Sequence, residues 1–301
     1  MIEATGLTKR YGDTVAVDDL SFTVGAGRVT GFLGPNGAGK STTMRMILGL
    51  DRPTGGKVLI DGKSYLELHR PLRTVGALLD AKWVHPNRSA RAHLQWLAKS
   101  NGISDKRVDE VLEMVGLTQV AKRRAGGFSL GMSQRLGIAG TLLGDPRVLL
   151  FDEPVNGLDP EGILWIRQFM HRLADEGRTV FVSSHLLSEM AQTAQDLIVI
   201  GRGRLIAQTS TAQFIKDATE DTVQVRSPQL EQLRPLLAAH GRVTEGAADG
   251  ALVVHGVEAA AIGEVAAANG ITLHELSPRL GSLEEAFMQL TRESVEYHGH
   301  D

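Results

Sequence analysis

The sequence predicts an α/β fold followed by a small α+β domain. Short apolar runs alternate with segments of helical periodicity, and a glycine-rich loop separates one such run from the helix after it. Near the C-terminus, strand and helix patterns follow one another in the order β-α-β-β-α-β. We therefore expect a larger domain at residues 1–218, with a helical subdomain at about 81–145, and an accessory α+β domain at 219–301.

Composition and charge limit the classes of protein to consider. The 301 residues suit two domains, since a domain averages about 150 residues. A formal net charge of −3 gives no general attraction to nucleic acid or to anionic lipid. The sequence has no cysteine, which excludes disulfides and thiolate metal sites and agrees with a reducing cytosol.

No segment has the pattern of a secretion signal or a membrane anchor. The first residues lack a basic region followed by an apolar one. No stretch reaches the ~18 apolar residues of a membrane span. We therefore expect no direct membrane insertion, and another chain must supply any spans with which the protein works.

The first residues predict a β-hairpin. Apolar and polar residues alternate from Ile2 to Tyr11 and from Val15 to Val24, with a Gly-Asp turn between the runs. Tyr11 ends the first run, where its ring can stack on a nucleotide base. An exposed tyrosine at a strand end is also common without such a role, so both interpretations stay open on local grounds.

A phosphate-binding loop follows the next strand pattern. It matches G-x-x-x-x-G-K-[ST], whose backbone N–H groups surround nucleotide phosphates. Lys40 reaches the β- and γ-phosphates, and the Ser41 hydroxyl can ligate Mg²⁺. An apolar strand before the loop and helical spacing after it argue against a chance glycine-rich turn, so we expect a bound nucleoside triphosphate. The motif comprises Gly34, Pro35, Asn36, Gly37, Ala38, Gly39, Lys40, Ser41 and Thr42.

Two further strands end on groups that suit phosphate chemistry. The apolar run 148–151 leads to Asp152 and Glu153, at the edge where parallel strands present ligands. We expect Asp152 to hold Mg²⁺ through water and Glu153 to orient or deprotonate the attacking water. The preceding apolar run and the following proline disfavour the alternative, an acidic pair that only caps a helix. His185 follows strand 179–183 and can hydrogen-bond the γ-phosphate.

In this order, the motifs resemble those of the ATP-binding subunit of an ATP-binding cassette (ABC) transporter. Residues 128–132, Phe-Ser-Leu-Gly-Met, resemble the family signature L-S-G-G-Q, and residues 156–159 resemble the D-loop. The resemblance covers about residues 2–215 and makes Tyr11 the base-stacking aromatic and His185 the switch histidine. It implies a P-loop cassette with a mixed-sheet core, an antiparallel β subdomain and a helical subdomain, which hydrolyses ATP with Mg²⁺.

The resemblance also implies partners. Ser129 and the backbone of Gly131 would lie before a helix that starts near Met132 and would bind the ATP held by a second cassette, so we expect a homodimer that closes head to tail. A separate integral-membrane permease would use this closure, and the chain would lie on the cytoplasmic face of the membrane. Residues 81–100, including Trp83, would receive a helix of the permease, although Trp83 could equally be buried in the subdomain.

The chain departs from the family pattern at three positions. Leu130 replaces a signature glycine, Met132 replaces the final glutamine, and Asp80 replaces the Q-loop glutamine. Ser129 and Gly131 remain, and we expect Asp80 to reach Mg²⁺ through a water. These departures resemble the bacterial branch that exports antibiotics and peptides and confers resistance to them.

Two other functions agree less well with the sequence. A soluble cassette that acts on ribosomes or nucleic acid would resemble a twin-cassette chain or carry long coiled coils, and a P-loop kinase would not need residues 129–131. The basic residues of segment 81–145, such as Arg88, suit a solvated helix face better than a nucleic-acid site.

Ser282 and Glu285 form a capping box for an apolar-faced helix, which suggests docking and a regulatory or assembly role.

Overall fold

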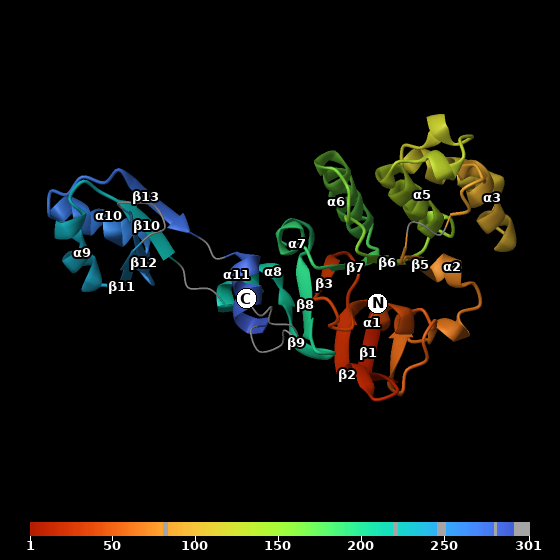
Figure 1. Ribbon diagram of the computed structural model, residues 1–301, viewed down its shortest axis with the longest axis horizontal. Coiled ribbons are helices and arrows are strands. Elements are labelled where there is room, and N and C mark those ends of the chain that lie inside the picture. The colour runs from red at the N-terminus through yellow and green to blue at the C-terminus, as the bar shows by residue number, and fades with distance from the viewer. Residues whose placement is uncertain (81–83, 219–221, 246–250, 280–281, 292–301) are drawn as a thin grey trace. The chain divides into compact units, whose positions relative to one another are not determined.

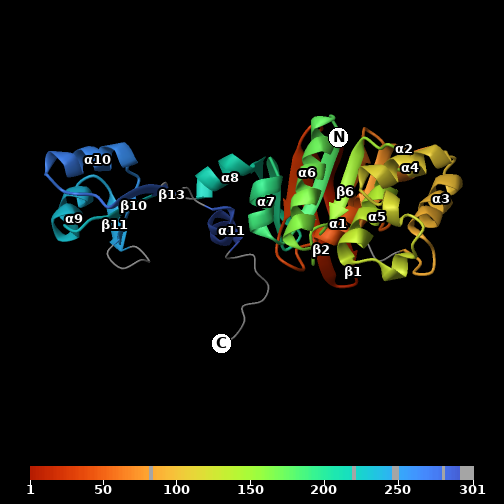
Figure 2. The ribbon, with the colours of Figure 1, turned by 90° about the horizontal axis from the view of Figure 1, so that it is seen from above.

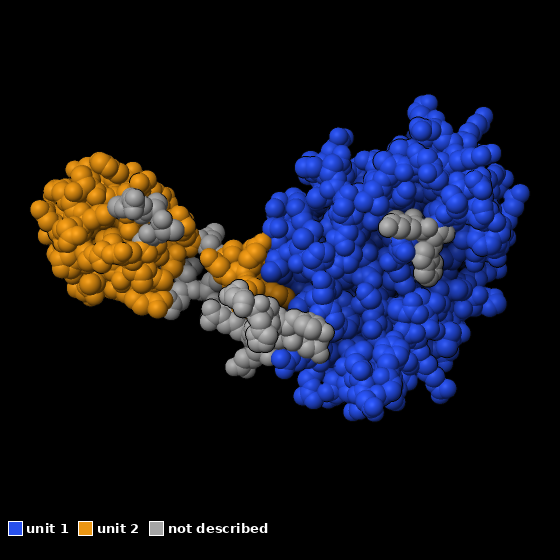
Figure 3. Space-filling view, viewed as in Figure 1, with its two compact units in different colours: residues 1–210, 294–301 blue, residues 211–293 orange. Residues whose placement is uncertain are grey.

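The computed structural model describes residues 1–80, 84–218, 222–245, 251–279 and 282–291 (Figure 1). Two compact units are present, one built on Met1–Ser210 and the other on Thr211–Glu293 (Figure 3). The predicted domain limits of 1–218 and 219–301 stay a prediction. No helix of the described residues is long and apolar enough to cross a bilayer.

A six-stranded sheet forms the centre of the larger unit, in the order β5-β6-β7-β3-β8-β9. All neighbouring strands are parallel except β8 and β9. Strand β3 is buried along its whole length because it is apolar and has layers on both faces. The strands are β3 (Val29–Leu33), β5 (Val75–Leu78), β6 (Val148–Asp152), β7 (Thr179–Ser184), β8 (Asp196–Gly201) and β9 (Arg204–Ser210).

An antiparallel sheet, in the order β2-β1-β4, packs with helix α1 on one face of this centre. Its strands are β1 (Ile2–Tyr11), β2 (Thr14–Val24) and β4 (Gly55–Ile60), and the pairing of Ile2 with Val24 confirms the predicted hairpin. Phe22 of this sheet lies with its ring centroid 5.8 Å from Phe32 and from Phe181 of the central sheet.

Helices cover the remaining surfaces of the central sheet. A Cβ at Gly31 would lie 3.0 Å from Met190 in α7, which places α7 on the face opposite α1. Helices α3, α4 and α5 pack on one another and gather on one side of the unit, within the predicted helical subdomain (Figure 2). The helices are α1 (Lys40–Ile47), α2 (Pro71–Thr74), α3 (Ala90–Ser100), α4 (Asp105–Met114), α5 (Leu130–Leu142), α6 (Pro160–Asp175) and α7 (Leu187–Thr193), with short 3-10 turns η1 (Tyr65–Glu67), η2 (Thr118–Val120) and η3 (Ala125–Gly127).

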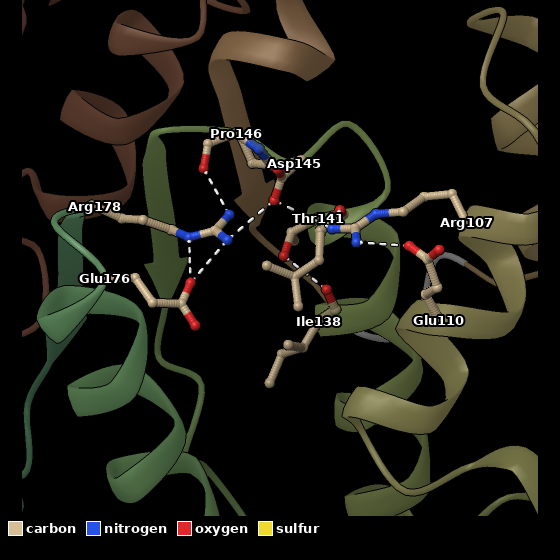
Figure 4. Close-up of polar contacts among 9 residues, drawn as sticks. Arg107, Glu110, Ile138, Thr141, Asp145, Pro146, Glu176 and Arg178 are labelled. Atoms are coloured by element: carbon tan, nitrogen blue, oxygen red, sulfur yellow. Dashed lines mark hydrogen bonds and ion pairs between the residues drawn. The ribbon is translucent and has the colours of Figure 1, made fainter.

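A charged network joins the helical layer to the central sheet (Figure 4). Asp145, in the connection from α5 to β6, accepts a hydrogen bond from Arg107 of α4 at 3.3 Å and forms an ion pair with Arg178 at 3.0 Å. Arg178 precedes β7 and also donates to the carbonyl of Pro146 at 3.0 Å. Both arginine side chains are less than a fifth exposed, so these contacts fix α4 to the base of β6 and β7.

The smaller unit contains the predicted β-α-β-β-α-β order. Its antiparallel sheet runs β11-β12-β10-β13, and α9 and α10 contribute to one apolar core with it. The last strand starts at Glu275 rather than at the predicted Ile271, because the N–H of Ile271 donates to Ala266 and closes the end of α10. The elements are α8 (Thr211–Ala218), β10 (Thr222–Arg226), α9 (Leu230–Ala238), β11 (Arg242–Glu245), β12 (Ala251–His255), α10 (Ala259–Ala268), β13 (Glu275–Arg279) and α11 (Leu283–Thr291).

The predicted capping box is present at the start of α11. The N–H of Glu285 donates to the Ser282 hydroxyl at 3.1 Å, and the N–H of Ser282 donates to the Glu285 carboxylate at 3.0 Å. Leu283 and Ala286 are fully buried, and α11 packs against α8 within the same unit. The apolar face of this helix is therefore used inside the chain.

Candidate active site

The glycine-rich loop joins β3 to α1 and has a backbone that only glycine allows at two points. Gly39 has φ of +100°, and a Cβ there would lie 2.5 Å from the carbonyl oxygen of Ala16. A Cβ at Gly34 would lie 2.6 Å from the carbonyl oxygen of Ile200. The two glycines therefore let the loop pack closely against β2 and β8.

Lys40, the first residue of α1, is buried inside this loop with only 7% of its surface exposed. Its ammonium group donates to the carbonyls of Gly34 at 2.6 Å and Pro35 at 3.2 Å. Burial lowers the pKa of Lys40, and the nearby carboxylates of Glu153 and Asp152 oppose that shift. A buried cation with carbonyl partners is suited to accept an anionic ligand.

Ser183 of β7 contacts both acidic residues at the end of β6. Asp152 pairs in register with Ser183, and the Ser183 hydroxyl donates a hydrogen bond to the Asp152 carboxylate. Glu153 has the unusual φ of +49° for a non-glycine residue, and its N–H donates to the Ser183 hydroxyl at 3.1 Å. Such a backbone is costly and is common at functional sites, where the surroundings hold it in place.

Glu153 and His185 form a pair at the mouth of the loop. Nδ1 of His185 lies 2.8 Å from Oε2 of Glu153, and the Glu153 side chain is 21% exposed. Together with Asn156 and loop residues 36–42, this pair lines a cavity of about 410 Å³. The structure thus brings together residues from separate stretches of the sequence. One cavity is lined by Lys40, Ser41, Glu153 and His185.

The oxygen donors near this cavity suit Mg²⁺. Ser41 and Asp152 offer hard hydroxyl and carboxylate oxygens, and Mg²⁺ prefers such oxygens at few protein ligands, with phosphates and water completing its shell. Within the described residues, no group of three or more His, Cys, Asp or Glu side chains could hold a metal without such help. The donor set therefore fits a nucleotide-bound Mg²⁺ rather than a site built by the protein alone.

Tyr11 lies at the end of β1 and is 48% exposed. Its hydroxyl donates to Asp51 at 2.8 Å, and the Lys9 ammonium lies 4.8 Å from the ring centroid. Tyr11 is not among the residues that line the cavity. Asp51 was not predicted as a partner of Tyr11, because no local pattern marks a contact between residues forty positions apart.

Ser129 and Gly131 also lie outside this cavity of their own chain. The Ser129 hydroxyl accepts the N–H of Met132 at 3.2 Å, so Ser129 is the N-cap and α5 begins at Leu130. The expected start near Met132 was wrong, because the helix begins two residues earlier. A Cβ at Gly157 would lie 2.6 Å from Leu130, so this unusual signature residue packs against the segment that resembles the D-loop.

Asp80 lines a second cavity, also of about 410 Å³, instead of the phosphate-loop cavity. We call it the apolar groove, because leucines and aromatic residues provide most of its lining. Nδ1 of His93 is buried there with no hydrogen-bond partner, and burial together with Arg88 lowers the pKa of His93. Trp83 lies outside the described residues. The groove is lined by Leu48, Leu50, Tyr65, Leu72, Val75, Ala77, Leu78, Leu79, Asp80, Val84, His93, Trp96, Leu97, Leu136, Gly137, Gly140 and Thr141.

Family models match both parts of the chain. The model described as ABC transporter matches residues 17–156, and a domain of unknown function (DUF8746) matches residues 221–284. The bacitracin transport ATP-binding protein BcrA of Bacillus licheniformis is 46% identical over 211 residues, which are 69% of each chain. The uncharacterized ABC transporter ATP-binding protein YhcH of Bacillus subtilis is 38% identical and covers 100% of this chain and 99% of its own.

Solved structures agree with these relatives. The ATP-binding subunit of an ABC transporter has a TM-score of 0.65 at 25% identity, and it covers 72% of this chain and 92% of its own. A dimeric ATP-binding cassette in a post-hydrolysis state, bound to ADP and phosphate, has a TM-score of 0.63 at 25% identity, with 70% and 99% covered.

Proposed function

The chain belongs to the ATP-binding subunits of ABC transporters, which hydrolyse ATP, and on that premise we propose that it powers an exporter of antibiotic peptides. The observation that carries the proposal is the convergence of Lys40, Glu153 and His185 on one cavity. The names of related proteins, which include bacitracin and lantibiotic transport, support the substrate class. These relatives favour a transporter over an ATPase that acts on ribosomes or nucleic acid.

The cavity suggests a role for each residue. Loop N–H groups and the α1 dipole would bind the ATP phosphates, and the Lys40 ammonium would exchange its carbonyl partners for phosphate oxygens. Glu153 would accept a proton from the attacking water, and His185, already 2.8 Å from Glu153, would hold the γ-phosphate side of the site. No other carboxylate lines this cavity among the described residues, so Glu153 is our candidate base.

Mg²⁺ would be held by Ser41 and, through water, by Asp152. When bound, it would neutralise the charge that develops on the phosphates. Asp80 lines the apolar groove rather than this cavity, so it would reach the metal only through a water. Asp80 tests this set, since aspartate adds a negative charge that a glutamine would not. We expect ATP affinity to depend on Mg²⁺ several-fold more strongly in the wild type than in Asp80→Gln, because like charges repel without the metal. Equal dependence in ATP titrations would place Asp80 away from the metal.

The signature suggests a homodimer. Ser129 and Gly131 do not line the cavity of their own chain, which is the arrangement expected if they bind the nucleotide of a second copy. They stand at the N-terminus of α5, where N–H groups and the helix dipole favour an anion. The dimeric structure of a related cassette supports the same assembly.

The apolar groove suggests where a permease docks. Leu50 and Trp96 line it and are each 53% exposed, so a helix of the membrane subunit could bury them. The chain would then lie at the inner face of the membrane through this contact. Affinity purification of the tagged chain from membranes tests the proposal directly. We expect an integral-membrane protein to co-purify in stoichiometric amount, and recovery of ribosomes instead would refute the transporter role.

A further inference from the structure

A carboxylate outside the recognised motifs joins the base-stacking tyrosine to the phosphate-loop helix. After α1 the chain turns back through Gly49, whose φ is +64°, and the N–H of Leu50 donates to the carbonyl of Arg45 at 2.9 Å. This turn brings Asp51 over the helix end. Its Oδ2 accepts hydrogen bonds from the Tyr11 hydroxyl and from Nε of Arg45, each at 2.8 Å, and its Oδ1 lies 3.3 Å from Nη2 of Arg45.

We propose that Asp51 is a positioning residue for the nucleotide base. Its carboxylate fixes the Tyr11 ring relative to α1, the helix whose first residues are Lys40 and Ser41. The base of ATP would then contact the Tyr11 ring while its phosphates contact the start of α1, and the distance between these two surfaces would be fixed. The inference rests on the proposed stacking role of Tyr11, and it adds the residue that orients that ring.

A ring that is half exposed needs such a tether. Tyr11 is 48% exposed, whereas the Asp51 side chain is only 17% exposed. Without its hydroxyl contact the ring would rotate among its rotamers, and ordering it would cost binding free energy each time a base stacked. Asp51 removes that cost in advance, because Arg45 holds the carboxylate with two hydrogen bonds.

Lys9 determines which face of the ring remains for the base. Its ammonium group lies 4.8 Å from the ring centroid and donates to the carbonyl of Arg52 at 2.8 Å. The cation is attracted to the negative face of the ring and covers it. Because Arg52 follows Asp51, the same turn secures the edge and one face of Tyr11. The opposite face is then the stacking surface.

The protonation states preserve the tether. Burial and the hydrogen bond to Asp51 raise the pKa of Tyr11, so its hydroxyl remains a donor at neutral pH. The hydrogen bond from Arg45, with a smaller contribution from Tyr11, holds the pKa of Asp51 below its ordinary value. The carboxylate therefore remains an acceptor well into the acidic range.

The test is a double-mutant cycle on the full chain, with ATP and inorganic tripolyphosphate as the two probes in calorimetric titrations. We expect Asp51→Ala to weaken ATP binding about 5-fold, the scale of one hydrogen-bonded contact, and to leave tripolyphosphate binding within twofold. Tyr11→Phe removes only the hydroxyl of an exposed ring, so it should fold and show the same selective loss. The double variant should bind ATP no more weakly than either single variant.

Asp196→Ala is the matched control. It breaks an ion pair of the same kind, in which Arg28 donates to the two Asp196 oxygens at 2.7 and 3.0 Å, away from Tyr11. We expect its ATP affinity to equal that of the wild type. Equal losses for both probes in Asp51→Ala, or a full additional loss in the double variant, would overturn the positioning role. A wild type that binds neither probe would instead refute the proposed function.

Discussion

The phosphate-loop cavity and the apolar groove have the same volume, about 410 Å³, but opposite chemistry. One is lined by a glycine-rich backbone, a buried ammonium, a carboxylate and an imidazole. The other is lined mainly by apolar residues, seven of them leucines, with Trp96 and Tyr65 beside them. The difference shows that polarity, rather than size, separates a site for a charged small molecule from a site for apolar side chains of a partner.

The two linings also differ in which unfavourable groups a bound molecule would stabilise. The polar cavity contains strained or desolvated groups, namely the left-handed Glu153 and the buried Lys40, which a ligand can compensate. The apolar groove contains exposed leucine and tryptophan that lose contact with water when covered. Substitutions in the polar cavity should therefore change ATP binding or hydrolysis, and substitutions in the apolar groove should change binding of the partner.

The largest effect is expected for Glu153→Gln in the polar cavity. Glutamine keeps the size of the side chain but cannot accept the proton of water, so hydrolysis should fall about 10²- to 10⁴-fold. ATP should still bind, and with Mg²⁺ the variant should elute as a dimer in size exclusion. Glu113→Gln, on the exposed surface of α4, is the control. Turnover at the wild-type rate would exclude Glu153 as the base.

Lys40→Ala should weaken ATP binding about 10- to 100-fold, the scale of a hydrogen bond to a charged group. The ammonium group supplies the positive charge that the phosphates meet inside the loop. Calorimetric titration measures the loss, with Lys57→Ala on the exposed face of β4 as the control. Wild-type affinity in Lys40→Ala would show that the phosphates bind elsewhere.

In the apolar groove, the double variant Leu50→Ser with Trp96→Ser should reduce the amount of co-purified membrane protein about 10-fold, because two exposed anchors are lost. ATP affinity, a property of the other cavity, should stay at the wild-type value. Leu205→Ser replaces an exposed leucine of β9 that is outside the groove and should retain the partner. If the wild type, the double variant and Leu205→Ser all recover the partner equally, the permease docks on another surface.

The smallest expected effect is a pH dependence of stability in the absence of nucleotide. Burial lowers the pKa of Lys40 in the folded protein, so above that lowered pKa the unfolded state binds more protons and wild-type stability rises with pH. Lys40→Met lacks this pH-dependent contribution to the free energy of unfolding. The melting temperature of Lys40→Met should exceed that of the wild type near neutral pH, and the gap should narrow toward pH 10.5. A gap that is independent of pH would contradict the buried ammonium.

Much of the polar cavity could be predicted because its residues belong to local patterns. The phosphate loop, the carboxylates after a buried strand and the family resemblance were readable, and the comparisons confirm the predicted ABC fold and family. The roles assigned to individual residues stay predictions. The start of α5 was missed because Ser129, rather than a residue nearer Met132, caps the helix.

The apolar groove and Asp51 could not be predicted in the same way. The groove combines residues from position 48 to position 141, and no local periodicity shows which leucines share a cavity. Asp51 contacts Tyr11 only because the chain reverses at Gly49. Both features depend on tertiary contacts between segments that are distant in the sequence.

ATP-driven efflux of an antibiotic peptide, with bacitracin as the first probe, is the most direct test that the two cavities have separate tasks. It would be measured in proteoliposomes that contain the chain and the membrane protein that co-purifies with it. We expect Glu153→Gln to stop both hydrolysis and efflux, and the double groove variant to stop efflux while the chain still hydrolyses ATP. Efflux at the wild-type rate in the groove variant, or efflux that continues in Glu153→Gln, would contradict this division.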